Sequence, residues 1–400
     1  SDLTAPKGFL ASGIHCGLKK SNLKKDLALI YSEVPAAASG MFTKNKVKGA
    51  PISISKDHLS NKKAQAIIVN SGNANTCNGT DGLNKAKKMT GLQAKELNLK
   101  ADDILVASTG VIGVPLNIDA IKSGIPLLTQ KLSKEGHDDA SSAIMTTDTV
   151  KKELALEFTI GDKVVTIGAM AKGSGMIEPN MGTMLSFITT DIAITPELLD
   201  EALKSCVKVT YNRVSVDGDT STNDSVFILA NGLAENNLIS EKNEDYETFL
   251  KALTDLNTIM ARNIAKDGEG ATKLLECKIS GAKTEEDASI LGKSVINSPL
   301  VKTAMFGSDA NWGRVLCALG YANINFDPEK VDVSFQSSKG ELNVCKSGSS
   351  LDFDEDKAKE ILSEDEIIID INLNSGKYGA VIWGCDLTYE YVKINGDYRS

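Results

Sequence analysis

Short apolar runs bounded by glycine or asparagine recur along the whole chain and alternate with segments of helical periodicity. Apolar residues at three- and four-residue steps predict helices over 82–97, 196–211 and 245–264. Strands and helices are mixed without a regular strand–helix–strand repeat, so we expect an α+β fold with helix layers over sheets. The apolar runs predict strands over 26–33, 64–72, 103–110, 163–173, 183–191, 224–232, 366–373 and 379–388.

The length of the chain predicts more than one compact unit. Its 400 residues, 42% of them hydrophobic, exceed the roughly 100–200 residues of a usual domain. We therefore expect two lobes, or one large elaborated domain, with a sizeable core. Residues 292–303 are the expected connection between the lobes.

Charge and cysteine usage argue against several classes of protein. The 44 Lys and Arg residues face 53 Asp and Glu, a net charge of −9 without a dense basic stripe, which disfavours a nucleic-acid partner. Lysine pairs such as Lys19–Lys20 and Lys24–Lys25 are expected on solvated faces. Seven scattered cysteines without a C-x-x-C motif indicate a reduced compartment and no zinc or iron–sulfur site. Without a signal-peptide pattern or an apolar run of about 18 residues, we expect a cytoplasmic protein with no membrane partner.

The residues available for chemistry point away from the commonest hydrolases. The three histidines, His15, His58 and His137, form no H-E-x-x-H motif, and no G-x-S-x-G elbow or nucleotide-binding glycine motif occurs. We therefore expect no bound metal or nucleotide cofactor. An acyl-transfer enzyme of this composition needs another base, and the α-amine of an N-terminal threonine, with a pKa of about 7.7–8.0, is one.

The stretch AKGSGMIEPNMGTMLSFITTD, residues 171–191, offers such a threonine if the chain cuts itself. The hydroxyl of Thr183 would attack the carbonyl of Gly182, in a bent peptide that a residue without Cβ adopts easily. Gly173 and Gly175 would leave backbone N–H groups open to a carboxylate or an oxyanion. On the pattern alone, the simpler interpretation is a loop that leads into a buried strand.

The same stretch resembles the signature of the ornithine acetyltransferase family, the ArgJ proteins of arginine biosynthesis. In that signature a lysine–glycine run leads to N-M-(Ala/Gly)-T-M-L, and the threonine is the nucleophile. The resemblance runs essentially end to end, because further family-like blocks follow in the expected order. These are STGVIGVPL (108–116), SSAIMTTDT (141–149), SVDGDTSTND (215–224), KDGEGATK (266–273), GSDANWGRV (307–315) and CDLTYEYVKINGDYRS (385–400).

The resemblance implies a fold, an assembly and a reaction. The fold is an α-β-β-α sandwich, as in certain self-processing aminopeptidases, with a smaller C-terminal lobe. Cleavage would give segments 1–182 and 183–400, which stay associated in a heterotetramer. The reaction is acetyl transfer from N2-acetyl-L-ornithine to L-glutamate without a cofactor, and some members also use acetyl-CoA as the donor.

The resemblance also assigns roles to individual residues. Thr183 would carry the acetyl group as an ester, with its own α-amine as the base. The Thr109 hydroxyl and the Gly110 N–H would stabilise the oxyanion. Substrate contacts are assigned to Thr146, Lys172, Thr183, Glu269, Asn395 and Ser400.

The chemistry of the assigned substrate contacts fits amino acids. The Lys172 ammonium suits an α-carboxylate, and the Glu269 carboxylate suits an amine. Thr147 is the alternative to Thr146 if the register shifts by one residue. Without the resemblance, Lys172 would be a solvated lysine and DGEG a helix-ending turn.

Four positions depart from the family pattern. The usual tail is closer to N-A-D-Y-R-T, so Gly396 and Ser400 differ, although serine keeps the hydroxyl. Glu178 and Gly182 stand where histidine and alanine are more usual. Gly182 still suits self-cleavage, whereas Glu178 bears on substrate choice.

Two other functions stay open from the sequence. An amidase or aminopeptidase with an amino-terminal nucleophile would use water in place of glutamate as the acceptor. A non-catalytic binding protein for acetylated amino acids would leave the Gly182–Thr183 bond intact.

Overall fold

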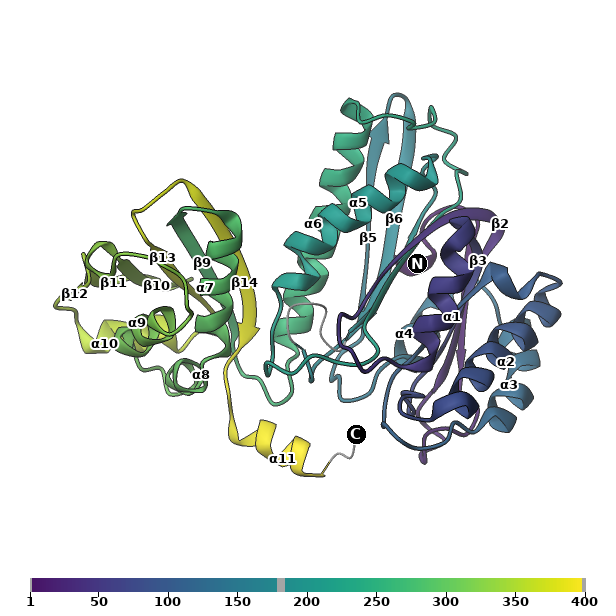
Figure 1. The fold of residues 1–400 in the computed structure, drawn as a ribbon, viewed down its shortest axis with the longest axis horizontal. Coiled ribbons are helices and arrows are strands. Elements are labelled where there is room, and N and C mark those ends of the chain that lie inside the picture. Colours follow the sequence, from purple (N-terminus) through teal and green to yellow (C-terminus); the bar gives the residue numbers. More distant parts are fainter. Residues whose placement is uncertain (1, 178–183, 398–400) are drawn as a thin grey trace.

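The computed structural model of the chain describes residues 2–177 and 184–397. Its larger lobe is built on an eight-stranded sheet of order β4-β3-β2-β8-β7-β6-β5, with β1 paired to β2 (Figure 1). The strands are β1 (Phe9–Ile14), β2 (Leu27–Phe42), β3 (Lys63–Asn70), β4 (Ile104–Ser108), β5 (Lys152–Ile160), β6 (Lys163–Lys172), β7 (Leu185–Thr190) and β8 (Ser225–Ala230).

The long strand β2 joins two halves of this sheet. Residues 27–31 and 36–37 pair with β3, and residues 37–42 pair with β8. The register shifts between Tyr31 and Ala36, next to Pro35, which has no N–H to give to a ladder. The irregularity allows the sheet to fold over on itself, and this produces two β-layers.

Side-chain alternation shows which face of each layer is inside. Phe187 and Phe227 face the core between the two layers, with their ring centroids 5.9 Å apart. Their neighbours Ile188 and Val226 point the other way, into the core under α5 (Pro196–Val209) and α6 (Glu244–Lys266).

The other β-layer is covered by a second group of helices (Figure 1). Ile68 and Val106 pack in the core beneath these helices, whereas Ile67 and Leu105 face the space between the layers. The predicted α-β-β-α sandwich is therefore confirmed. The covering helices are α1 (Ala50–His58), α2 (Gly79–Leu97) and α3 (Ile118–Gln130), and α4 (His137–Ala143) packs against β1 and β2.

A smaller C-terminal lobe holds a six-stranded sheet of order β12-β11-β10-β13-β9-β14. Leu274, Trp383 and Cys385 of this sheet share the core of α6, so α6 lies between the lobes. Its strands are β9 (Leu274–Ala282), β10 (Asp332–Ser337), β11 (Gly340–Lys346), β12 (Ser349–Ser350), β13 (Glu366–Asn372) and β14 (Tyr378–Cys385). Its helices are α7 (Glu285–Asn297), α8 (Pro299–Phe306), α9 (Trp312–Gly320) and α10 (Glu355–Leu362).

The last described element returns to the larger lobe. Helix α11 (Tyr389–Asp397) follows β14 and runs back toward the lower end of the larger lobe (Figure 1). Short 3-10 helices complete the described elements: η1 (Asp2–Thr4), η2 (Leu59–Asn61), η3 (Ala101–Asp103), η4 (Tyr211–Arg213) and η5 (Pro328–Lys330).

The prediction that residues 292–303 connect the two lobes is wrong. These residues belong to α7 and α8, where Val295 and Val301 are buried and the Ser298 hydroxyl caps α8 ahead of Pro299. The lobes are joined instead by residues 267–273, between the end of α6 and the start of β9.

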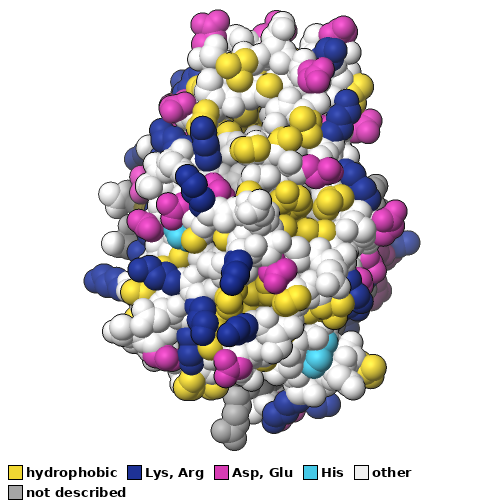
Figure 2. Space-filling model, turned by 90° about the vertical axis from the view of Figure 1, so that its right-hand side faces the viewer, with side chains coloured by type: hydrophobic (Ala, Val, Ile, Leu, Met, Phe, Trp, Pro, Cys, Tyr) yellow, Lys and Arg dark blue, Asp and Glu magenta, His cyan; other side chains and the backbone are white. Residues whose placement is uncertain are grey.

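The surface of the larger lobe mixes charges of both signs. On the face that Figure 2 shows, Lys and Arg side chains lie among Asp and Glu side chains and hydrophobic ones. None of the helices in the described residues is both long and apolar enough to cross a membrane.

Candidate active site

A cavity of 280 Å³ lies where the ends of β4 and β6 and the start of β8 meet α11. A volume of this size suits a small amino acid derivative. Of the residues predicted from the sequence to form the site, Gly182, Thr183 and Ser400 lie outside the described residues. All the others line this cavity, namely Thr109, Gly110, Thr146, Lys172, Glu269 and Asn395.

Lys172 is the cation at the centre of the cavity wall. It ends β6 and is 2% exposed, and its Nζ donates hydrogen bonds to the Thr109 Oγ1 (3.1 Å) and the Thr146 Oγ1 (2.8 Å). Burial lowers the pKa of Lys172, and the Asp148 carboxylate opposes that effect. Within the described residues no carboxylate forms a direct ion pair with Lys172. Its ammonium is therefore suited to a carboxylate that arrives with a substrate.

Gly110 occupies a backbone conformation that other residues rarely adopt. Its φ is 135°, and a Cβ there would lie 2.4 Å from the amide nitrogen of Asn73. In the described parts of the chain, the Gly110 N–H has no hydrogen-bond acceptor, whereas the Thr109 N–H donates to the carbonyl of Asn70 (3.1 Å). A free N–H beside a hydroxyl is the arrangement that stabilises an oxyanion.

Glu269 lies in the connection between the two lobes. Its N–H donates to the carbonyl of Ser174 (2.7 Å), and a Cβ on Gly175 would lie 1.4 Å from its Oε1. Gly175 is therefore the residue that lets this carboxylate reach the cavity. Burial, reinforced by Asp217, raises the pKa of Glu269, and contacts with the polar side chains of Thr147 and Asn395 oppose the rise.

Thr146 and Thr147 face different partners in the cavity. Thr146 accepts from Lys172, whereas the hydroxyl of Thr147 lies 2.6 Å from the Ser174 hydroxyl. Both threonines line the cavity, Thr146 next to Lys172 and Thr147 next to Ser174.

A buried ionic network that sequence reasoning missed supports this wall. The Lys152 Nζ lies 2.6 Å from the Asp148 Oδ2 and 2.7 Å from the Asp267 Oδ2. Asp148 also accepts the Gly173 N–H (2.9 Å), so this N–H is engaged and not open to an oxyanion, contrary to expectation. The network joins the segment before β5, the end of β6 and the connection that carries Glu269.

A second carboxylate that sequence reasoning missed anchors the loop after β6 and helix α11. Asp217 accepts the N–H groups of Met176 (2.7 Å) and Ile177 (3.0 Å) and the Tyr391 hydroxyl (3.0 Å). Burial raises the pKa of Asp217. Its signal in the sequence was the pair of acidic residues on either side of Gly218 in SVDGDTSTND, residues 215–224.

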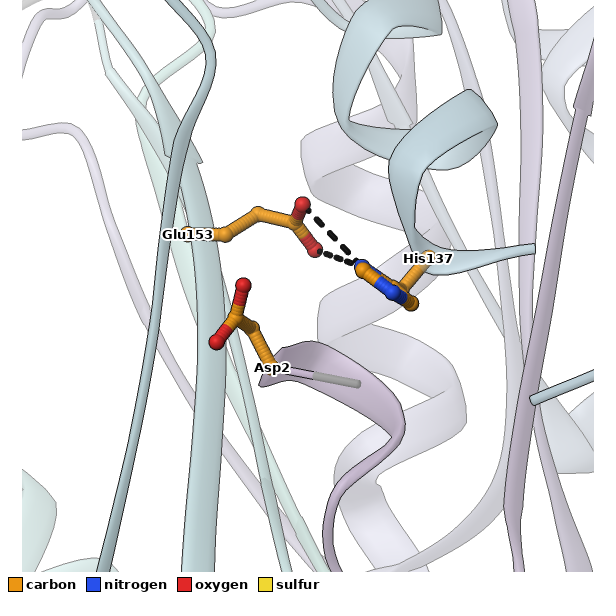
Figure 3. A group of neighbouring side chains, drawn as sticks. All are labelled: Asp2, His137 and Glu153. Carbon is orange, nitrogen blue, oxygen red and sulfur yellow. Dashed lines mark hydrogen bonds and ion pairs between the residues drawn. The ribbon is translucent and has the colours of Figure 1, made fainter. Parts of the chain in front are cut away.

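A separate cluster joins η1, α4 and β5 (Figure 3). The His137 Nδ1 lies 2.9 Å from the Glu153 Oε1, and the Asp2 carboxylate faces them. Burial raises the pKa of Glu153, with the His137 interaction opposing it. The His137 Nδ1 contact already engages the Glu153 carboxylate, so we interpret the cluster as a structural link between α4 and β5.

Comparison with known proteins identifies similar chains over the full length. The family model described as "ArgJ family" matches residues 10–400. The Arginine biosynthesis bifunctional protein ArgJ 1 of Clostridium acetobutylicum is 55% identical over 98% of this chain and 96% of its own. The Arginine biosynthesis bifunctional protein ArgJ of Caldanaerobacter subterraneus subsp. tengcongensis is 52% identical over 99% of this chain and 98% of its own.

A solved structure extends the likeness to the fold. The crystal structure of the Arginine biosynthesis bifunctional protein argJ from Bacillus halodurans is 43% identical, with a TM-score of 0.52. The match covers 54% of this chain and 100% of that chain.

Proposed function

Because this chain belongs to the ArgJ family of arginine-biosynthesis proteins, we propose that it is a self-cleaving transferase that moves acetyl from N2-acetyl-L-ornithine to L-glutamate. The proposal rests on one observation. The Lys172 Nζ donates hydrogen bonds to the hydroxyls of Thr109 and Thr146, in a cavity that Glu269 also lines. These groups supply a cation for an α-carboxylate, an anion for an amine and donors for an oxyanion.

The transfer takes two steps through Thr183. Its hydroxyl oxygen attacks the acetyl carbon of acetylornithine, the amide C–N bond breaks, and ornithine leaves with the proton on its amine. The glutamate amine then attacks the acetyl-threonine ester, the C–O bond breaks, and the hydroxyl regains its proton. Thr109 and Gly110 would stabilise the tetrahedral oxygen in both steps.

Self-cleavage would free the α-amine that acts as the base. The Thr183 hydroxyl attacks the Gly182 carbonyl, the C–N bond breaks and an ester forms, which water hydrolyses to a carboxylate and the free hydroxyl. The strand order supports a stable cut protein, because β7 and β8 of the second segment lie between β2 and β6 of the first. Segments 1–182 and 183–400 would stay joined by the sheet, and we propose that two such pairs form the heterotetramer.

Two measurements test this function on the freshly purified protein. Intact mass under denaturing conditions, with terminal sequencing, should show two fragments, the second starting at Thr183. Ornithine release from N2-acetyl-L-ornithine beyond one equivalent per active site should require L-glutamate, with N-acetylglutamate formed in equal amount to this further ornithine. Release of acetate without glutamate would indicate the amidase instead, and an uncleaved, inactive chain would indicate the binding protein.

Replacing Gly175 should disable substrate binding without unfolding the protein. A Cβ in Gly175→Ala would displace the flexible Glu269 carboxylate, which lies 1.4 Å from that position. We expect kcat/KM for N2-acetyl-L-ornithine to fall at least about tenfold, because a misplaced contact weakens the transition state. The melting temperature should stay within a few degrees, as measured by thermal unfolding.

Gly91→Ala is the matched control, because a Cβ at Gly91 on α2 meets no atom within 4 Å. It should keep the wild-type kcat/KM. An unchanged kcat/KM for Gly175→Ala would mean that Glu269 does not bind substrate.

A groove next to the cavity supports acetyl-CoA as a second acetyl donor. The groove has a volume of 830 Å³, shares Thr146 with the cavity and is lined by Lys19, Lys20 and Lys24. Lys20 and Lys24 are exposed. Their charges, beside the reacting centre, suit the phosphates of a larger donor.

The loop that contributes Lys19, Lys20 and Lys24 to this groove is held in place by a buried carboxylate. The fully buried Asp26 accepts the N–H groups of Cys16 (2.7 Å), Leu18 (2.8 Å) and Lys19 (2.9 Å). The Lys19 Nζ donates to the carbonyl groups of Lys25 and Met145, and burial lowers the pKa of Lys19 to about 8. The expectation that Lys19 lies on a solvated face is therefore wrong.

Reversing the two exposed lysine charges should weaken the use of acetyl-CoA alone. For Lys20→Glu with Lys24→Glu, we expect the KM for acetyl-CoA to rise about tenfold at low salt. The difference should shrink at high salt, since screening weakens exposed charges. The KM for N2-acetyl-L-ornithine should not change.

The matched control is Lys87→Glu with Lys88→Glu, two exposed lysines on α2. Steady-state kinetics with each donor distinguish the outcomes. An equal rise of both KM values, or no rise for acetyl-CoA, would contradict a donor site in this groove.

A further inference from the structure

The side chains that line the cavity carry an excess of negative charge. Among the lining residues that the structure describes, Lys172 is the single cation, whereas Asp217, Asp219 and Glu269 are acids. Glu269 is buried, Asp217 is half-buried and Asp219 is exposed. The proposed function uses Lys172 and Glu269 to bind substrate and leaves Asp217 only to anchor a loop and a helix. A half-buried charge on a cavity wall also faces whatever fills the cavity.

One short segment brings Glu269 and Asp217 together. A Cβ on Gly175 would lie 1.4 Å from the Glu269 Oε1, so this carboxylate lies directly against residue 175. The next N–H groups along the chain, those of Met176 (2.7 Å) and Ile177 (3.0 Å), donate to the Asp217 carboxylate. The two carboxylates therefore contact neighbouring residues of the same segment.

Helix α11 contacts the same two carboxylates. The Tyr391 hydroxyl donates to the Asp217 Oδ2 (3.0 Å), and Asn395, one turn further along the helix, interacts with Glu269. Burial raises the pKa of Tyr391, and the charges of Asp217 and Glu269 reinforce the rise, so Tyr391 stays a neutral donor. The segment 175–177 and α11 thus place Asp217 and Glu269 side by side, and we call these two groups the carboxyl pair.

The carboxyl pair titrates at a higher pH than isolated carboxyls. Burial raises the pKa of both groups, and the Asp217 charge adds to the rise at Glu269. Backbone N–H groups and Tyr391 oppose the rise at Asp217, while polar contacts and then the Lys172 ammonium oppose it at Glu269. Burial also raises the pKa of the Cys385 thiol, which stays neutral. The titratable side chains that face the pair in the described residues are Lys172 of β6, Asp219 before β8, Cys385 of β14 and Tyr391 of α11.

The two substrates of the proposed function place opposite charges at the same point. Both present an α-carboxylate to Lys172, and the glutamate nitrogen takes the place at the acetyl group that the ornithine nitrogen leaves. Their side chains therefore extend in the same direction from the α-carbon. The ornithine amine nitrogen and a glutamate carboxyl oxygen lie the same number of bonds from that carbon. One part of the cavity thus meets a cation in the first step and an anion in the second.

We propose that Asp217 is a specificity-determining residue, which with Glu269 binds the side-chain ammonium of ornithine and takes up a proton from solvent when the side-chain carboxylate of glutamate replaces it. This inference rests on the proposed function. Neighbouring carboxylates repel a third one, and a proton held by the pair removes part of that repulsion. A protonated carboxyl also donates a hydrogen bond to the incoming carboxylate.

Calorimetry with amino acids that differ only at the side-chain end tests this inference on the wild-type protein without an acetyl donor. L-Ornithine, L-glutamate and uncharged L-norvaline share a carbon chain, and each is titrated from about pH 5 to 8 in buffers of different ionisation enthalpy. We expect glutamate to take up about one proton more than norvaline within this range. The Kd of glutamate should rise up to about tenfold per pH unit above the pKa of the pair, whereas the Kd of ornithine should fall as the pair ionises.

Asp217→Asn removes the charge and keeps an oxygen for the backbone N–H groups. We expect the Kd of ornithine to rise about tenfold, the Kd of glutamate not to rise more than about twofold, and the proton uptake to fall by at least about half. Tyr391→Phe is the second variant, because it removes the hydroxyl that favours ionised Asp217 and leaves the backbone contacts in place. It should shift the pH dependence of glutamate binding toward higher pH.

Asp191→Asn is the matched control, because the Asp191 carboxylate also accepts backbone N–H groups, those of Lys7 and Thr166, and does not line the cavity. It should keep the wild-type Kd values and proton uptake. Equal proton uptake by glutamate and norvaline in the wild type would overturn the inference alone. So would a wild-type ratio of the ornithine and glutamate Kd values in Asp217→Asn, or an unshifted pH dependence in Tyr391→Phe. A wild-type protein that binds neither ornithine nor glutamate would overturn the proposed function, and the inference with it.

Discussion

Thr183→Ala is expected to leave a single uncleaved chain and to lower kcat/KM for acetyl transfer by at least about a thousandfold. The substitution removes the oxygen that attacks both the Gly182 carbonyl and the acetyl group. It therefore removes the base as well, since an uncleaved chain has no α-amine at residue 183. Intact mass and the glutamate-dependent release of ornithine measure the two losses on the same sample.

Thr183→Ser is the control for this prediction. Serine keeps the hydroxyl and loses only a methyl group, so it should still be cleaved and should retain measurable transfer. Turnover by Thr183→Ala near the wild-type rate would assign the nucleophile to another residue. Cleavage of Thr183→Ala at the same bond would show that self-cleavage does not need this hydroxyl.

The larger elements of the fold could be predicted because their apolar patterns are strong. The predicted strands at 64–72 and 224–232 correspond to β3 and β8, and the helix predicted at 245–264 corresponds to α6. Each is buried along one face or completely, so burial and local pattern agree.

Elements with weaker patterns escaped prediction for physical reasons. Strand β5 lies at the edge of its sheet and is only partly buried, so its pattern KELALEFTI mixes charges with apolar residues. The second half of β2 contains Pro35 and three consecutive alanines, which carry little hydrophobic signal. The arrangement of the sheet in two layers follows from the irregularity in β2, and no local sequence pattern predicts that irregularity.

The candidate site likewise contains residues that the sequence predicted and residues that it did not. Its threonines, Lys172 and Glu269 were assigned through family-like blocks, and the described members of that set line one cavity. Asp148 and Asp217 were missed because their roles depend on backbone N–H groups from distant segments. A carboxylate that accepts main-chain amides across a fold has no signature in spacing, and only the structure shows its partners.

Lys172→Met should abolish most substrate binding while leaving the fold intact. Methionine keeps the unbranched stem in the buried slot and removes the ammonium that donates to Thr109 and Thr146. We expect kcat/KM for N2-acetyl-L-ornithine to fall by about a hundredfold, mainly through KM, because a charge-assisted hydrogen bond to the α-carboxylate is lost. Lys163→Met, an exposed lysine at the other end of β6, should have no such effect.

The pH dependence separates this role from simple packing. Burial lowers the pKa of Lys172, so the native ammonium binds a carboxylate below that lowered pKa and loses its proton, and the substrate, as the pH rises through it. The wild-type kcat/KM should therefore decline on the alkaline side before the ordinary lysine pKa of about 10.4, and Lys172→Met should lack this decline. In the unfolded chain, Lys172 keeps its proton up to that ordinary pKa, whereas in the native protein it loses the proton at a lower pH. Between these two pKa values the unfolded state binds more protons, so the free energy of unfolding rises with pH. Lys172→Met should reduce this rise. A variant that keeps both the wild-type KM and the alkaline decline would place the carboxylate on another group of the cavity.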